Sequence, residues 1–280
     1  MRAVVLDAGG QPGLADVGEP EGNGRLVRVL ACGLCGSDVE KIGRAPAGTV
    51  LGHEVAAELD GRRVALVHHL PCGRCDRCRA GHESTCDAFR AATIVPGGFA
   101  ERVLATETLD LPDSLDDATA TYVEPLACVL RAAERLPAGR VLIVGNGFVG
   151  RLFAVVLRRQ DREVFAVDTD PRRAGTPPDG PVDAAVLCAP GGANEAAEAL
   201  TPGGTLLVFA PSAPLDLGAV YRRELNVTGS RSATPRHMRS AIELLPELDV
   251  PEPAVLRLDR FAEGLDLYRR GEALKVVFTP

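Results

Sequence analysis

Four cysteines in one short segment offer the clearest chemistry in the chain: Cys72, Cys75, Cys78 and Cys86. Thiolates separated by two residues turn around one ion and present tetrahedral sulfur at about 2.3 Å, which suits a structural zinc. Because the chain opens on a strand-like segment, residues 2–6, and not on a secretory leader, we expect a reducing cytoplasm and metal binding instead of disulfides. A closed four-sulfur site has no open coordination position, so it stabilises the fold and the catalytic chemistry must lie elsewhere.

A second set of donors lies on both sides of that segment. It comprises Cys35 in Cys-Gly-Ser-Asp, His53 and Glu54 in Gly-His-Glu, and Glu124 in Val-Glu-Pro-Leu. One thiolate, one imidazole and one or two carboxylates are suitable zinc ligands, and an oxygen of water or alcohol completes the set. Taken singly, each residue has a structural alternative, since cysteine is a common buried residue and a lone histidine is more often structural than ligating.

A glycine-rich turn follows the apolar strand predicted at residues 140–144 and precedes a helix predicted at 151–159. This position between strand and helix is the context that makes a G-x-G-x-x-G pattern a dinucleotide-binding signal. The phosphate is expected at the helix N-terminus, where free amides and the helix dipole favour negative charge. The predicted cofactor-binding residues of this turn are Gly145, Gly147, Phe148, Val149 and Gly150.

Asp168 ends the next predicted strand, residues 163–167. A carboxylate there accepts hydrogen bonds from both hydroxyls of an adenosine ribose and repels a 2′-phosphate, which favours NAD. Arg172 and Arg173 follow closely, and an arginine such as Arg173 could pair with a phosphate, so NADP stays open.

The elements around these motifs change in character along the chain. Residues 1 to about 120 contain short strands and turns, with a hairpin predicted at Asp60-Gly61 and a strand at 97–103. A helix is predicted over residues 116–136, and buried strands alternate with helices after it. Between Asp168 and the strand predicted at 182–188 there are 13 residues, several of them proline, which is too short for a strand with its crossover helix. We therefore expect a trimmed parallel sheet with the Asp168 strand at or near an edge.

Composition agrees with a globular protein. The 280 residues are 46% hydrophobic and 25% charged, and the formal net charge is −7. No apolar run approaches the roughly 18 residues of a membrane helix, and the interspersed negative charge argues against a nucleic-acid surface. We expect neither a membrane nor a nucleic acid as partner.

The order of these motifs, with the donor set around a four-cysteine loop and ahead of a nucleotide-binding unit, resembles the zinc-dependent medium-chain alcohol dehydrogenases. Val-Glu-Pro-Leu and Cys-Gly-Ser-Asp are most similar to the polyol (sorbitol or iditol) branch, in a shortened form. The resemblance implies an α/β fold: a GroES-like, mostly-β catalytic domain plus a trimmed Rossmann doubly wound parallel sheet. We predict the catalytic domain at residues 1–124 and 232–280, with the structural zinc lobe at 72–86, and the NAD-binding domain at 125–231.

The resemblance also implies roles for the donor set. Cys35, His53 and Glu54 would hold a catalytic zinc, and Glu124 would bind it directly or through water, giving two Zn²⁺ per chain with the structural site. Zinc acidifies a bound alcohol, so that hydride can pass from its carbon to NAD or NADP. Ser37 would take the alcohol proton, and Glu40 stands where many relatives have a relay histidine. The expected reaction is oxidation of a secondary alcohol of a polyol, cyclitol or sugar, or the reverse reduction, by a cytoplasmic homodimer or homotetramer.

Two alternatives stay open from the sequence: an amino-alcohol dehydrogenase of the threonine type, and a non-catalytic zinc or redox sensor on a dehydrogenase scaffold. The other four histidines are given no role, and His82, inside the cysteine loop, could be a ligand only by displacing a cysteine. His68 and His69 are expected on a strand entering the cysteine loop, on opposite faces because side chains alternate. His237 is expected on the exposed face of an amphipathic helix at about residues 235–245.

Overall fold

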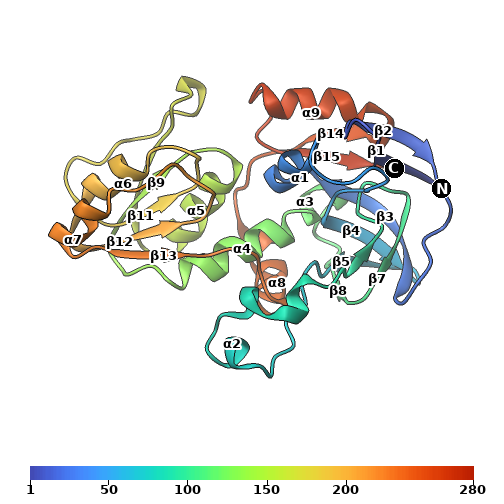
Figure 1. Ribbon diagram of the computed structural model, residues 1–280, viewed down its shortest axis with the longest axis horizontal. Helices are drawn as coiled ribbons and strands as arrows, with labels where there is room; N and C mark the ends of the chain where they lie inside the picture. The colour runs from blue at the N-terminus through green and yellow to red at the C-terminus, as the bar shows by residue number, and fades with distance from the viewer. The chain divides into compact units, whose positions relative to one another are not determined.

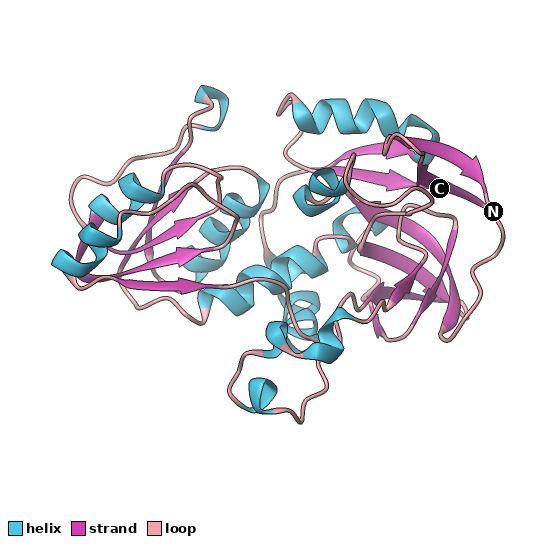
Figure 2. Ribbon diagram, in the orientation of Figure 1, coloured by secondary structure: helices cyan, strands magenta, loops and turns pink.

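The computed structural model describes residues 1–89 and 91–280, and these fold into two units. Unit 1 comprises Met1–Ala127, Ala233–Glu247 and Pro251–Pro280, and unit 2 comprises Cys128–Ser232 with Leu248–Val250. Figure 1 follows the chain through both units, and Figure 2 separates their strands and helices. None of the helices within the described residues is long and apolar enough to cross a membrane.

Unit 1 is built mainly from antiparallel strands. Eight of them form one sheet in which β14, β15, β3, β4, β5 and β8 are consecutive neighbours and β7 joins β3 to β6, while β1 and β2 form a separate pair. The strands are β1 (Arg2–Leu6), β2 (Pro12–Asp16), β3 (Arg25–Gly33), β4 (Glu54–Leu59), β5 (Arg62–Leu66), β6 (Ile94–Val95), β7 (Arg102–Ala105), β8 (Thr108–Asp110), β14 (Ala254–Arg257) and β15 (Val276–Thr279).

Short helices connect these strands. The α-helices that begin in unit 1 are α1 (Gly36–Lys41), α2 (Asp76–Arg79), α3 (Asp117–Ala120), α4 (Val123–Ala133, which continues into unit 2), α8 (Pro235–Leu244) and α9 (Phe261–Arg269). The 3₁₀ helices of unit 1 are η1 (Glu83–Thr85), η2 (Asp87–Arg90), η4 (Leu245–Glu247) and η5 (Leu258–Arg260).

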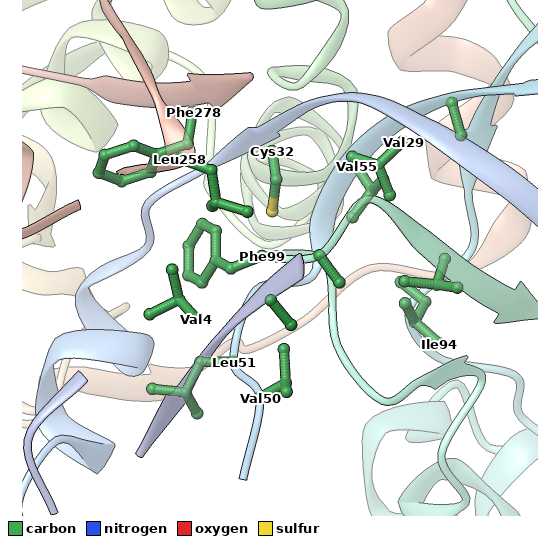
Figure 3. Packing of buried hydrophobic residues seen from close by; sticks show 14 of the residues in the cluster. Val4, Val29, Cys32, Val50, Leu51, Val55, Ile94, Phe99, Leu258 and Phe278 are labelled. Atoms are coloured by element: carbon green, nitrogen blue, oxygen red, sulfur yellow. The ribbon is translucent and has the colours of Figure 1, made fainter. Parts of the chain in front are cut away.

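The core of unit 1 gathers side chains from distant parts of the chain. Figure 3 shows Phe99 beside Cys32 and Leu258, with Phe278 close by. The ring of Phe99 lies edge-on to those of Phe261 and Phe278, at centroid separations of 5.0 and 5.6 Å. Burial of these aromatic rings, at about 25 cal/mol per Å² of apolar surface, ties the C-terminal elements to the strands that carry the donor set.

Unit 2 is a parallel sheet with strand order β10-β9-β11-β12-β13. Apolar residues alternate along β9: Leu142 and Val144 pack with the α6 side of the sheet, whereas Ile143 approaches Gly150 of α5. The two helices therefore cover opposite faces, as in a doubly wound sheet. The elements are β9 (Arg140–Val144), α5 (Phe148–Arg159), β10 (Glu163–Val167), η3 (Pro171–Arg173), β11 (Val182–Leu187), α6 (Ala193–Ala199), β12 (Leu200–Val208), α7 (Leu217–Arg223) and β13 (Asn226–Gly229).

Two predictions about local topology are confirmed. The Asp168 strand, β10, is an edge strand, since it pairs only with β9 among the named strands. The Asp60-Gly61 turn joins β4 to β5, and both residues have positive φ, 51° and 76°, as a two-residue hairpin of type I′ requires.

Other predictions about elements are wrong. The helix expected over 116–136 is divided into α3 and α4, and the helix expected from 151 begins earlier, at Phe148. The strand expected at 97–103 is β7 at Arg102–Ala105, because Gly97 and Gly98 lie in a tight approach where a Cβ at Gly97 would lie 2.2 Å from the carbonyl oxygen of Val50. His237 is buried and not exposed, since its Nδ1 hydrogen-bonds the hydroxyl of Thr234 at 2.8 Å.

Candidate functional site

The three donors Cys35, His53 and Glu54 are brought together by one pair of antiparallel strands. Glu54 opens β4, where it pairs with Gly33 at the end of β3, and Cys35 follows as the residue that caps α1. The candidate ligand atoms of the three residues all lie within 4.8 Å of one another. Cys32, the other cysteine nearby, is outside this group because its sulfur packs against Gly52 and Gly98.

A buried aspartate, which the sequence analysis left without a role, fixes the imidazole. Asp38 is 1% exposed, and its Oδ1 lies 3.3 Å from Nδ1 of His53. Its carboxylate also accepts the backbone N–H groups of Gly52 at 3.3 Å and Cys35 at 3.2 Å. A carboxylate on one ring nitrogen orients a ligating histidine and leaves the other nitrogen for a metal. An acidic residue three positions after Cys35, in the first turn of a helix, was the available sequence signal.

The proximity of these two groups moves their pKa values in opposite directions. Burial opposes ionisation of Asp38, but His53 outweighs it, and the pKa of the carboxyl group is lowered. Burial likewise opposes protonation of His53, but Asp38 and Cys35 outweigh it, and the pKa of the imidazole is raised. A metal at the other ring nitrogen of His53 therefore competes with a proton there, while the proton on Nδ1 stays hydrogen-bonded to Asp38.

In the metal-free protein, Asp38→Asn is expected to destabilise unit 1 by about 1–3 kcal/mol near pH 5.5 and by less near pH 10. The lowered pKa of Asp38 gives stability that is present above its unfolded value of 3.8 and is lost as the pH falls through the folded value. The raised pKa of His53 gives stability that is complete below 6.5 and is lost as the pH rises through the folded value. Urea unfolding of both proteins with chelator at the two pH values measures this difference, and an equal loss at both would contradict it.

Glu54 has a buried cationic partner, Lys275, at the other end of the chain. The two side chains form an ion pair in which both are 2% exposed, and Nζ of Lys275 also donates to the carbonyl of Leu34 at 3.2 Å. Gly33 makes room for the pair, because a Cβ there would lie 2.2 Å from Oε2 of Glu54 and 3.0 Å from Cε of Lys275. Sequence reasoning missed Lys275, since nothing local connects residues so far apart in the chain.

The other predicted residues of this site differ in their placement. Ser37 is exposed, and its hydroxyl donates to Sγ of Cys35 at 3.4 Å. Glu40 is exposed on α1, beyond this contact. Glu124 is buried near the start of α4 but is not a member of the three-residue group. The structure thus brings together three of the four predicted ligands and adds Asp38 and Lys275.

His68 and His69 do not alternate across a strand as predicted, because β5 ends at Leu66. Instead, the ring of His68 lies 4.4 Å from that of His53 and 3.8 Å from that of His69, between centroids. The pKa of His68 is lowered, chiefly by burial and then by the neighbouring histidines, so this ring is neutral. The region around the donor set is therefore lined by imidazole on one side.

The four loop cysteines also converge. Their sulfur atoms all lie within 4.8 Å of one another, with Sγ of Cys75 3.5 Å and that of Cys72 4.0 Å from Sγ of Cys78. Backbone amides of Arg74 and Cys75 lower the pKa of Cys72 to about 6, which favours the thiolate that a metal binds. Figure 1 shows the segment that carries α2 as a loop standing apart from the strands of unit 1.

In unit 2 the glycine-rich turn leaves room for a ligand. A Cβ at Gly150 would lie 2.1 Å from the carbonyl oxygen of Gly145, so the helix and strand pack too closely for a side chain there. A Cβ at Gly147, in contrast, would meet only Nη1 of Arg173, at 3.5 Å. Since α5 begins at Phe148, the N-terminal end of the helix, with the positive end of its dipole, lies at this turn.

Asp168 holds this turn against the end of β10. Its Oδ2 accepts the backbone N–H of Asn146 at 2.8 Å, and its Oδ1 accepts that of Asp170 at 2.8 Å. Asp170 in turn engages both arginines that follow it: Nη2 of Arg172 at 2.7 Å and Nη2 of Arg173 at 3.1 Å. Hydrogen bonds from these arginines, Arg172 first, lower the pKa of Asp170 far below its usual range. The cations next to the turn are thus partly neutralised by a carboxylate.

Comparison with known proteins places these features in context. Residues 22–113 match the family described as alcohol dehydrogenase GroES-like domain. The chain is 30% identical over 269 residues to D-altritol 5-dehydrogenase of Agrobacterium fabrum (strain C58 / ATCC 33970), covering 79% of this chain and 80% of that protein. It is 30% identical over 201 residues to L-threonine 3-dehydrogenase of Rhizobium etli (strain CIAT 652), covering 62% of this chain and 58% of that protein. It spans about half the length of several other curated relatives that it matches.

Among solved structures, acetophenone reductase from Geotrichum candidum NBRC 4597 in complex with NAD is similar over 100% of this chain and 97% of that one. The TM-score is 0.85 at 21% identity, which is a likeness of fold. Together with the matched domain and the observed parallel sheet, it confirms the predicted fold class, a GroES-like domain with a trimmed Rossmann unit.

Proposed function

Since the chain belongs to the zinc-type medium-chain alcohol dehydrogenase family, in its polyol-like branch, we propose that it oxidises a secondary alcohol of a polyol, cyclitol or sugar with NAD(P), or catalyses the reverse reduction. The observation that carries this proposal is the convergence of one thiolate, one imidazole and one carboxylate within 4.8 Å, with a buried aspartate behind the imidazole. This donor set has the composition of a catalytic zinc site, which keeps one position for a water or substrate oxygen.

The metal fits both groups of donors. Cys35 and His53, with Glu54, would hold a catalytic zinc, and Cys72, Cys75, Cys78 and Cys86 would hold a structural one. Glu54 is shared between this role and its ion pair with Lys275, so that Cys35 and His53 are the stronger candidates. When bound, the metal supplies Lewis-acid activation of an alcohol and NAD(P) supplies the hydride acceptor.

The chain's own residues would orient the metal ligands and take the proton from the alcohol. Asp38 keeps the imidazole of His53 in one orientation through the Nδ1 contact. The hydroxyl of Ser37 lies beside Cys35 and is exposed, so it can accept the alcohol proton and pass it to solvent or to Glu40. Loss of one hydride from the carbon and one proton from the oxygen of the alcohol would leave a ketone; the nicotinamide would accept the hydride and Ser37 would accept the proton.

The glycine-rich turn supports NAD as the cofactor. The open side of Gly147 and the N-terminal end of α5, where the helix dipole favours negative charge, suit a pyrophosphate, and Gly145 and Gly150 shape the turn between strand and helix. Asp168 would hold the ribose in this proposal, which is supported by the lone pair that each of its oxygens keeps beyond its backbone hydrogen bond.

Loss of the Asp170 carboxylate is expected to shift cofactor preference. In Asp170→Asn, Arg172 and Arg173 lose their shared partner and become available to a 2′-phosphate, so the NADP⁺ dissociation constant should fall by about tenfold relative to that of NAD⁺. Calorimetric titration of both nucleotides measures the ratio. Arg158→Gln, which removes an arginine from the C-terminal end of α5, is the matched control and should leave the ratio unchanged.

A threonine-type amino-alcohol dehydrogenase is the second candidate, because relatives of that name match at 30% identity. The two candidates differ in whether the substrate carries an ammonium group. A panel of polyols, sugar acids and amino alcohols, read by NADH absorbance, separates them directly. Turnover of L-threonine with no turnover of any polyol would favour the second.

The experiment that tests the proposal is metal analysis of the purified protein paired with nucleotide titration and that panel. We expect two zinc ions per chain, saturable NAD(P) binding and turnover of at least one alcohol. One zinc per chain with no nucleotide binding and no turnover would contradict the proposal and favour a non-catalytic zinc protein. We further propose a homodimer or homotetramer, which light scattering tests.

A further inference from the structure

Four aromatic rings form a continuous stack between the two groups of candidate metal ligands in unit 1. The ring of His53 lies 4.4 Å from that of His68, which lies 3.8 Å from that of His69, which lies 4.2 Å from that of Phe89. His69 and Phe89 are nearly parallel, with an interplanar angle of 10°, while the other two pairs are tilted by 30° and 49°. Every ring in this stack, the ring stack hereafter, is in contact with the next.

The far end of the ring stack is attached to the cysteine loop. Phe89 is 2% exposed, and its backbone N–H donates to the carbonyl of Cys86 at 3.1 Å. Cys86 is also 2% exposed, and its sulfur accepts the backbone N–H of Cys72 at 3.4 Å. A metal held by the four sulfur atoms would fix Cys86 and, through it, the position of Phe89.

The near end is attached to the donor set. His53 is held on one side by Asp38, at 3.3 Å, and meets His68 with the face of its ring. The hydroxyl of Thr93 donates to the carbonyl of His68 at 2.5 Å, which fixes the backbone of the segment between β5 and the cysteine loop. Each ring in a stack of this kind restricts its neighbour, and aromatic pairs contribute about 0.5–1.5 kcal/mol beyond their burial.

We propose that the ring stack positions His53, so that occupation of the four-cysteine loop raises the affinity of the Cys35–His53 centre for its metal. His68, His69 and Phe89 are positioning residues in this arrangement. The coupling is carried by packed side chains, and linkage makes it reciprocal: metal at Cys35 and His53 tightens the loop's metal by the same factor. The inference rests on the proposed function, since it requires both metal centres.

The test uses the full-length protein and measures metal affinity. Competition with a chromophoric chelator gives the Zn²⁺ dissociation constant of each class of site. The class of zinc site that disappears in Cys35→Ala is assigned to the Cys35–His53 centre. Cobalt substitution supplies a second readout, because the visible d–d bands report the ligand geometry at that centre.

Phe89→Leu removes one ring while keeping an apolar side chain. We expect it to weaken Zn²⁺ at the Cys35–His53 centre by about tenfold, at the low end of the loss for residues that support a metal ligand, and to change the cobalt d–d bands. His69→Leu should have the same effect, whereas His69→Phe retains a ring and should stay within about twofold of the unsubstituted protein. Phe165→Leu, which removes a buried ring of unit 2, is the control and should leave the affinity unchanged.

Emptying the loop tests the coupling itself. Cys72→Ser should weaken Zn²⁺ at the Cys35–His53 centre by a similar factor. Combining it with Phe89→Leu should add little, because both act through one path. Unaltered Zn²⁺ affinity of the Cys35–His53 centre in both Phe89→Leu and Cys72→Ser would overturn this inference and leave the proposed function standing. A single zinc class that persists in Cys35→Ala would overturn both.

Discussion

Cys35→Ala is expected to remove one of two bound zinc ions and to lower kcat/KM by at least about 10³-fold, which corresponds to about 4 kcal/mol. The reason is that Cys35 is the thiolate of the three-residue donor group, and a centre left with His53 and a carboxylate already paired to Lys275 loses its strongest anionic ligand. Metal analysis by mass spectrometry and steady-state kinetics on the alcohol identified from the panel measure the two effects.

The matched control is Cys32→Ala, a cysteine three residues upstream. Cys32 is 1% exposed and packs against Gly52 and Gly98, outside the donor group. Its replacement leaves a small cavity that costs about 1 kcal/mol of stability, while both zinc ions and most of the activity should remain. If Cys32→Ala loses a zinc and Cys35→Ala does not, the assignment of the thiolate ligand is wrong.

Lys275→Met should destabilise unit 1 by about 3–5 kcal/mol, the largest stability effect that we expect from a single substitution in this chain. The Glu54 carboxylate would then be buried without its cation, and the carbonyl of Leu34 would lose a donor. Adding Glu54→Gln removes the unpaired charge, so the double variant should recover much of the loss in the free energy of unfolding. Denaturant titration followed by a probe in unit 1 measures each variant.

Lys41→Met is the control for this experiment, because Lys41 is the only other lysine and is exposed on α1. Its free energy of unfolding should change by no more than about 0.5 kcal/mol. The prediction about Lys275 fails if Lys275→Met is as mild as Lys41→Met, or if Glu54→Gln gives no recovery in the double variant.

The elements that the sequence predicted well are those set by local pattern. A two-residue type I′ turn requires positive φ at both residues, and aspartate and glycine adopt it readily. The hairpin therefore follows from Asp60 and Gly61 alone. The short proline-containing interval after Asp168 excludes another strand and crossover helix, which makes β10 an edge strand. The division into α3 and α4 and the burial of His237 were mispredicted. Tyr122, which lies between the two helices, is buried and donates its hydroxyl to the carbonyl of Pro251, a contact that the local pattern does not reveal.

The sequence by itself determined the donor types, their order and the glycine-rich turn, since thiolate spacing and strand–turn–helix patterns are local properties. Only the tertiary structure decided which of the donors meet. The pairing of Gly33 with Glu54 places Cys35 beside His53. Lys275, the residue immediately before β15, pairs with Glu54 from the far end of the chain. The ring stack from His53 to Phe89 is equally a product of packing. Such contacts form between side chains that are close in space, whatever their separation along the chain. A buried charge needs an opposite charge beside it, and aromatic rings stabilise one another when they pack.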